Sequence, residues 1–185
     1  MPNKLDRLLV VDIEATCWDG QIPPGQENEI IEIGICPLDI ASGQPLEKHS
    51  ILVKPTRSTV SEFCTQLTTL TPEQVNQGIT FAEACSILKK KYRASERVWA
   101  SYGDYDRKQF LKQCESFGVK YPFSPRHINV KTLLAIIHAL PKEVGMSRAL
   151  ELLNLPLEGT HHRGADDAWN IAKILSHLIV TARNS

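Results

Sequence analysis

The stretch from Leu8 to Glu14 constrains the fold of this chain more than any other part of the sequence. It reads LLVVDIE, so four apolar residues run directly into a segment that holds two acids. Apolar residues at both odd and even positions are typical of a strand whose two faces are both covered. We therefore expect a central strand here, in an α/β protein whose helices pack on both sides of a sheet.

The rest of the sequence supplies neighbours for that strand. Two further strands are expected at residues 29–38 and 46–53, and the intervening residues 19–28 contain Pro-Pro-Gly, which predicts a surface loop. Three leading strands followed by alternating helices and strands predict a central mixed five-stranded sheet, antiparallel at one edge, with the first strand in the middle. The later elements are helices that begin at Thr71-Pro72-Glu73 or cover residues 80–94, 104–117, 132–140, 147–154 and 165–181, and strands at residues 97–102 and 126–131.

Length and charge exclude several classes of protein. The 185 residues suit a single domain, and Lys plus Arg equals Asp plus Glu at 21 each, so the formal net charge is zero. A protein that coats nucleic acid usually carries a basic surface, so nucleic-acid binding by this chain would have to be local. No apolar run reaches the roughly 18 residues of a membrane span, and the N-terminal residues lack the layout of a signal peptide.

The cysteines are scattered at irregular spacings, without a CxxC pair. This pattern predicts reduced, mostly buried thiols and argues against a cysteine-ligated zinc site. Because reduced thiols are typical of the cytoplasm, we expect a cytoplasmic protein. The five residues are Cys17, Cys36, Cys64, Cys85 and Cys114.

Asp12 and Glu14 end the central strand. They are two residues apart, so both side chains leave the same face. Two carboxylates at the end of an apolar strand are costly unless they are paired or bind a metal ion. Ligands of open α/β sheets gather at the carboxyl ends of strands, so the pair predicts a ligand site. The alternative is a strand end at which the chain simply turns polar.

Helical periodicity selects one acid from the helix expected at residues 104–117. Asp106 shares a face with Phe110 and Cys114, so it should point inward. Asp104 precedes the helix and is the expected N-cap. The alternative role for Asp106 is compensation of the helix dipole.

The last helix carries two adjacent acids, Asp166 and Asp167. Asp167 shares a face with Ile171 and Ile174, whereas Asp166 shares a face with Asn170. We therefore expect Asp167 to point inward and Asp166 to face water. Asp167 also lies in the first turn, so it could serve only as a partner of the helix dipole.

Together, the inward acids suggest a site for two divalent ions, which clamp the attacking and leaving oxygens of a phosphodiester. Oxygen ligands of this kind suit Mg²⁺ or Mn²⁺. The loop before the last helix adds His161 and His162, and a histidine can accept a proton near neutral pH. A single loop histidine is more often an ordinary surface residue.

Three motifs built on these residues resemble the DEDDh, or DnaQ-like, 3′–5′ exonuclease superfamily. They are VDIEATC at residues 11–17, SYGDYD at residues 101–106, and His162 followed five residues later by Asp167. The motifs stand in the family order, and the resemblance extends over residues 8–178. The DIEATCW sequence and residues 63–68 are most similar to the branch of histone-mRNA 3′ exonucleases and Eri-type RNA exonucleases.

The resemblance implies a ribonuclease H-like fold and a single exonuclease domain. It also implies a metal-dependent enzyme with two Mg²⁺ or Mn²⁺ ions per active site, which releases 5′-mononucleotides from 3′ ends of RNA or single-stranded DNA. Asp12, Glu14 and Asp167 would hold one ion, Asp12 would also reach the second, and Asp106 would complete the acidic set. His162 would be the general base.

Five further residues are expected to contact the substrate. Ala15 and Thr16 should meet the terminal sugar through backbone and side chains. Tyr105 stands where close relatives often carry Trp, and it could stack on the terminal base. Phe63 and Leu67 could wedge near the bases, with core packing as the alternative.

Other functions remain open at this stage. They are an endonuclease of the same fold, a non-catalytic nucleic-acid-binding or adaptor module, and a polymerase-associated proofreading exonuclease. The preference for RNA or DNA stays open as well, because no residue can be assigned to the 2′-hydroxyl that distinguishes them.

Overall fold

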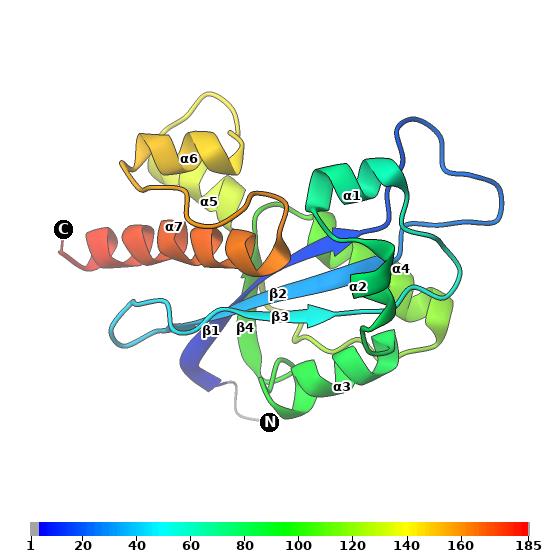
Figure 1. Ribbon diagram of the computed structural model, residues 1–185. Helices are drawn as coiled ribbons and strands as arrows, with labels where there is room; N and C mark the ends of the chain where they lie inside the picture. Colours follow the sequence, from blue (N-terminus) through cyan, green and yellow to red (C-terminus); the bar gives the residue numbers. More distant parts are fainter. Residues whose placement is uncertain (1–3, 185) are drawn as a thin grey trace.

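A computed structural model describes residues 4–184 as one mixed sheet covered by helices (Figure 1). The strand order is β3-β2-β1-β4-β5, with β1 antiparallel to β2 and parallel to β4. β3 pairs antiparallel with β2, and β5 pairs parallel with β4. The five-stranded sheet with the first strand in the middle is therefore confirmed. The strands are β1 Lys4–Ala15, β2 Ile30–Asp39, β3 His49–Leu52, β4 Arg97–Ser101 and β5 His127–Asn129.

Helices cover both faces of this sheet. In Figure 1, α5, α6 and α7 gather on one side and α3 lies on the other. Within residues 4–184 the helices are α1 Glu62–Thr68, α2 Pro72–Asn76, α3 Phe81–Lys90, α4 Tyr105–Phe117, α5 Val130–Ile137, α6 Met146–Leu152 and α7 Gly164–Asn184.

β1 is buried on both faces, as its pattern predicts. Leu8 and Val10 belong to the hydrophobic cluster formed with α5, α6 and α7. Leu9 and Val11 belong to the opposite cluster, formed with α3 and α4. Because both clusters pack on the same strand, the end of β1 emerges between two layers of helices.

The helix starts that the sequence predicts are confirmed by their caps. Thr71 caps α2 with Pro72 in the first turn, and Thr80 and Glu83 form the expected capping box of α3. Asp104 occupies the N-cap position of α4, as expected, but its side chain makes no capping hydrogen bond. Helix α1 has no counterpart among the predicted elements.

Helix α7 approaches the sheet through two glycines. A Cβ atom at Gly34 of β2 would overlap the carbonyl group of Gly164, the first residue of α7. A Cβ atom at Gly164 would lie 2.9 Å from the Gly34 nitrogen and 3.3 Å from the Asp12 carbonyl oxygen. Only glycine at both positions lets the helix start this close to the strands. The contact brings the first turn of α7 beside the end of β1.

Two further expectations concern the cysteines and the membrane. All five cysteines are free thiols, four of them buried and Cys17 partly so, as the sequence predicts. Among residues 4–184, none of the helices combines the length and the apolar character needed to cross a membrane.

Candidate active site

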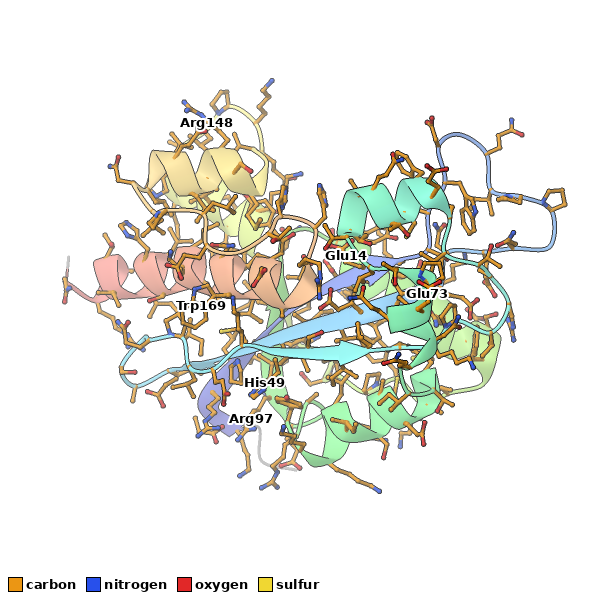
Figure 2. The ribbon with its side chains drawn as sticks, in the orientation of Figure 1. Glu14, His49, Glu73, Arg97, Arg148 and Trp169 are labelled. Atoms are coloured by element: carbon orange, nitrogen blue, oxygen red, sulfur yellow. The ribbon has the colours of Figure 1, made fainter. Side chains whose placement is uncertain are left out.

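A pocket of about 300 Å³ opens where β1 ends between the starts of α4 and α7. Glu14 lies near the middle of the molecule, between the start of α7 and helix α1 (Figure 2). The β1–β2 register shifts between Glu14 and Ala15, so regular pairing ends at the site. The pocket is lined by Asp12, Ile13, Glu14, Tyr102, Tyr105, Asp106, Met146, His161, His162 and Asp167.

The four acids selected from the sequence converge on this pocket. One carboxylate oxygen from each of Asp12, Glu14 and Asp167 lies within 4.8 Å of the others. Asp106 joins them from α4, because its Oδ1 accepts a hydrogen bond of 3.0 Å from the backbone N–H of Ile13. Asp106 and Asp167 are each 4% exposed, so both point inward as the periodicity predicts. Asp166 points away and forms an ion pair with Lys48 at 2.5 Å.

The crowding of carboxylates changes their proton affinities. Burial, followed by repulsion from Asp106 and Glu14, holds the pKa of Asp12 well above its usual range. Burial and the Asp167 carboxylate raise the pKa of Glu14 to about 8. Burial also raises the pKa of Asp106 to about 6. A group of acids that resist ionising together is electrostatically suited to divalent cations, and its oxygen donors fit Mg²⁺ or Mn²⁺. The pocket therefore fits a metal centre.

Two adjacent histidines contact Asp167 from the loop before α7. The His162 backbone N–H donates to Asp167 Oδ2 at 2.9 Å, and His161 Nδ1 lies 3.1 Å from each Asp167 oxygen. His162 has a positive φ of 63°, unusual for a residue with a side chain. The two imidazole rings stack with centroids 4.1 Å apart. Both histidines line the pocket.

His161 is a site residue that the sequence pattern did not distinguish from His162. Its ring, rather than that of His162, makes the direct side-chain contact with Asp167. Two neighbouring histidines in a loop have no periodicity that could rank them. The His162 pKa is lowered, chiefly by burial and then by His161.

Glu32 supports the start of α7 and was also missed. It pairs with Glu14 across β1 and β2, and its side chain is fully buried. Its carboxylate accepts hydrogen bonds from the Gly164 backbone N–H at 2.9 Å, from Arg163 Nε at 3.2 Å and from the Ser50 hydroxyl. An acid inside the apolar segment EIIEIG was the sequence signal available for it.

A second supporting network leads to Asp106. His127 Nε2 lies 2.8 Å from Ser101 Oγ, and that hydroxyl is also 2.9 Å from the Gly103 carbonyl oxygen. Burial has the largest effect on the pKa of Asp106 and raises it, while the backbone N–H groups of Asp106 and Ile13, followed by Ser101, lower it. Burial lowers the pKa of His127 to about 4, so its ring is neutral near pH 7. No sequence pattern indicates a role for Ser101 or His127.

The expected substrate residues divide into accessible and inaccessible ones. Tyr105 is 55% exposed at the pocket, as a stacking platform requires. Ala15 and Thr16 are buried, and the Thr16 hydroxyl donates to the Glu27 carbonyl and accepts from the Glu29 backbone N–H. The Thr16 side chain is therefore not available to a sugar, contrary to the expectation, and a contact there would come from the backbone.

Phe63 and Leu67 lie on helix α1. They are 38% and 37% exposed, so core packing, the alternative considered for them, does not describe either residue. Neither lines the pocket itself. A contact with bases would therefore fall outside the acidic centre.

Comparisons with known proteins identify the family of this chain. Residues 9–175 match the family described as exonuclease, RNase_T. The chain is 30% identical over 187 residues to the 3'-5' exoribonuclease 1 of Rattus norvegicus. The aligned region covers 94% of this chain and 53% of that protein. The chain thus spans about half the length of the curated relatives it matches first.

Two solved structures share the fold. The nuclease domain of 3'hExo, a DEDDh family member bound to rAMP, is similar with a TM-score of 0.85 and 26% identity, over 100% of this chain and 96% of that one. The second structure shows 3'-end specific recognition of histone mRNA stem-loop by 3'-exonuclease. It is similar with a TM-score of 0.83 and 27% identity, over 96% of this chain and 65% of that one. The expected ribonuclease H-like fold is thereby confirmed. The DEDDh exonucleases are a metal-dependent family, and this chain belongs to them, in the Eri-type branch of the RNase_T exonucleases.

Proposed function

We propose that this chain is a single-domain 3′–5′ exonuclease that removes 5′-mononucleotides from single-stranded nucleic acid, with RNA as its first substrate class. The convergence of Asp12, Glu14, Asp106 and Asp167 on one pocket carries the proposal. The name of the rat relative and the stem-loop bound by the 3'-exonuclease support RNA. Free, mostly buried thiols support a cytoplasmic location.

The carboxylates would hold two Mg²⁺ or Mn²⁺ ions. When bound, such ions neutralise the charge that develops on the scissile phosphate and make a water molecule more acidic. Asp12, Glu14 and Asp167 are the oxygen donors close enough to share one ion. Asp106 is held beside them by the Ile13 backbone N–H.

His162 would take the proton from the attacking water. It lines the same pocket as the acids, and its lowered pKa keeps the ring neutral near pH 7. A neutral imidazole can accept a proton, whereas an imidazolium cannot. The fixed backbone hydrogen bond to Asp167 holds His162 at the edge of the pocket.

Tyr105 would hold the terminal base. Its exposed ring borders the acidic centre, and an aromatic face can stack on any base. Stacking of this kind selects an unpaired end over a duplex end, since a paired base is already stacked within the helix. The zero net charge agrees with a short contact at the strand end rather than a long groove.

A panel of oligonucleotides tests the proposal. Matched RNA and DNA oligomers, single- and double-stranded, carry a label at either the 3′ or the 5′ end and are incubated with Mg²⁺ or Mn²⁺. The expected products are nucleoside 5′-monophosphates, with a ladder that shortens from the 3′ end. Asp12→Ala should abolish them. Internal fragments would indicate an endonuclease, and binding without any degradation would indicate an adaptor module.

A further inference from the structure

The pocket contains two overlapping sets of possible metal ligands. In one set, Asp12, Glu14 and Asp167 offer only carboxylate oxygens. In the other, His161, His162 and Asp167 offer two imidazole nitrogens and one carboxylate oxygen, again with ligand atoms within 4.8 Å of one another. Within residues 4–184 no other group of three such side chains comes this close. Asp167 belongs to both sets.

The two sets differ in the ion that they suit. Mg²⁺ takes oxygen ligands in octahedral geometry and keeps several waters. Zn²⁺ takes imidazole and carboxylate ligands readily, and sites with three protein ligands leave its fourth position open. Two neutral imidazoles and one carboxylate therefore match Zn²⁺ better than Mg²⁺.

The loop already places the three side chains of the mixed set next to one another. His161 Nδ1 lies 3.1 Å from both oxygens of Asp167. The His162 ring stacks on the His161 ring at an interplanar angle of 20°, so a rotation of one ring brings both nitrogens towards one ion. The backbone N–H of His162 fixes the Asp167 carboxylate from the same side. The His161 side chain is 41% exposed, so an ion can reach the group from solvent.

We propose that His161, His162 and Asp167 form a second metal site, selective for an imidazole-binding ion such as Zn²⁺, and that its occupation switches the exonuclease off. An ion held there takes Asp167 from the oxygen-only set and occupies the ring nitrogen of His162. The catalytic set then loses one carboxylate and its base together. This effect on catalysis rests on the proposed function, whereas the metal site itself does not.

Binding of Zn²⁺ alone to the metal-free protein is the first test. Calorimetry should show a tightest site that weakens at least roughly tenfold in His161→Gln and in His162→Gln, since each loses a nitrogen ligand. Glu14→Gln should keep that affinity within about threefold, because Glu14 belongs only to the oxygen set. His138→Gln is the matched control, since His138 is an exposed histidine outside the pocket.

X-ray absorption at the zinc edge provides a readout that needs no substitution. The wild-type protein with one equivalent of Zn²⁺ should show the multiple-scattering pattern of coordinated imidazole, which disappears or halves in His161→Gln. Folding of each variant is followed by circular dichroism. If a variant does not fold, the wild-type spectrum still decides whether imidazole binds the ion.

Inhibition links the site to activity. With each protein normalised to its own rate in Mg²⁺ alone, Zn²⁺ should inhibit the wild type and His138→Gln at concentrations at least roughly tenfold below those needed for His161→Gln. A zinc spectrum without imidazole, or a zinc affinity lost in Glu14→Gln and kept in His161→Gln, overturns the proposal. A protein that binds Zn²⁺ through His161 but degrades no nucleic acid with Mg²⁺ keeps the site and refutes the exonuclease.

Discussion

The starts of α4 and α7 place an acid at the same strand end by different means. At α4, Asp106 is held by a hydrogen bond from the Ile13 backbone N–H. At α7, the backbone of the helix itself contacts the sheet at Gly164, and Asp167 follows one turn later. Asp106 is thus held by a hydrogen bond from the strand, whereas Asp167 depends on the close start of its helix as well as on the His162 backbone N–H. Substitutions around Asp106 should therefore lower activity gradually, whereas displacement of α7 should disturb the whole site.

The partners of the two acids differ in the same way. Near Asp106, the Ser101 hydroxyl contacts His127, whose side chain is only 3% exposed. Asp167 instead contacts His161, which solvent reaches. The α7 side is therefore where protons and ions can be exchanged with solvent, while the support of Asp106 on the α4 side is enclosed.

Removing either acid should give the largest effect on activity. Asp106→Asn and Asp167→Asn should each lower kcat by about 10³-fold or more, because both carboxylates belong to one cation-binding centre. Single-turnover degradation of a 3′-labelled RNA measures this. Asp166→Asn, which changes the neighbouring carboxylate outside the pocket, should stay within about fivefold of the wild type. If only one of the two acids matters, the helix starts do not serve one site.

Displacing α7 should give the second-largest effect on activity. Gly34→Ala places a methyl group against the carbonyl of Gly164, and backbone on both sides cannot move aside. We expect a loss of about 1–3 kcal/mol in the free energy of unfolding and a fall in kcat of about 10²-fold, since a shift of one ångström at a reacting group costs that much.

Gly145→Ala is the matched control for Gly34→Ala. Nothing lies within 4 Å of a Cβ atom there, and the backbone φ of −67° suits alanine. Denaturant unfolding and kcat should both remain near wild-type values. Equal behaviour of the two variants would mean that the glycine contact does not position α7.

Weakening the support of Asp106 should have a smaller effect. His127→Phe removes the nitrogen that faces Ser101 while keeping an aromatic ring beside Trp99. The loss of one hydrogen bond in the network should lower kcat about 3–10-fold, with little change in KM. The Mg²⁺ concentration for half-maximal rate should rise as Asp106 loosens.

Rescue distinguishes positioning from general packing. His127→Gln restores a donor close to the position of the ring nitrogen and should recover most of the rate, whereas Ser101→Ala should match His127→Phe. A His127→Gln variant as slow as His127→Phe would show that ring packing, not the hydrogen bond, supports Asp106.

The contrast between the helix starts also shows what could be predicted from the sequence. Asp106 and Asp167 were selected because helical periodicity is local and relates residues one turn apart. The buried β1 was predicted from apolar residues at adjacent positions, which is equally local. Both patterns follow from the regular repeat of a helix or a strand, so they can be read from residues that are neighbours in the sequence.

The supporting contacts could not be predicted because they join distant segments. Gly34 and Gly164 are 130 positions apart in the sequence, and neither carries a local signal of the contact. His127 reaches Ser101 only because β4 and β5 are neighbours in the sheet. The exposed α1 lacks a long amphipathic repeat and was missed for that reason. The preference for His162 over His161 came from family resemblance, since the loop has no periodicity.

The stability of the metal-free protein should depend on pH in opposite directions through Glu14 and through His127. The pKa of Glu14 is raised from 4.5 to about 8 in the folded state, so folding takes up a proton there. Its ionisation therefore destabilises the folded state as pH rises from 4.5 to 8. The pKa of His127 is lowered from 6.5 to about 4, so its protonation destabilises the folded state as pH falls from 6.5 to 4. In the absence of metal, the free energy of unfolding should be highest between pH 4.5 and 6.5, where the two effects offset each other.

Melting curves from pH 4 to 9 with a chelator measure this smallest effect. In Glu14→Gln, the fall in Tm towards alkaline pH should become smaller by a few degrees, and the fall towards acid pH should not change. In His127→Phe, only the fall towards acid pH should become smaller. Added Mg²⁺ should raise Tm on the alkaline side, because the ion binds carboxylates only after they lose their protons. The same addition should not change the acid side, since His127 is not a ligand. If both variants changed the same side of the curve, Glu14 and His127 would titrate as one coupled network rather than independently.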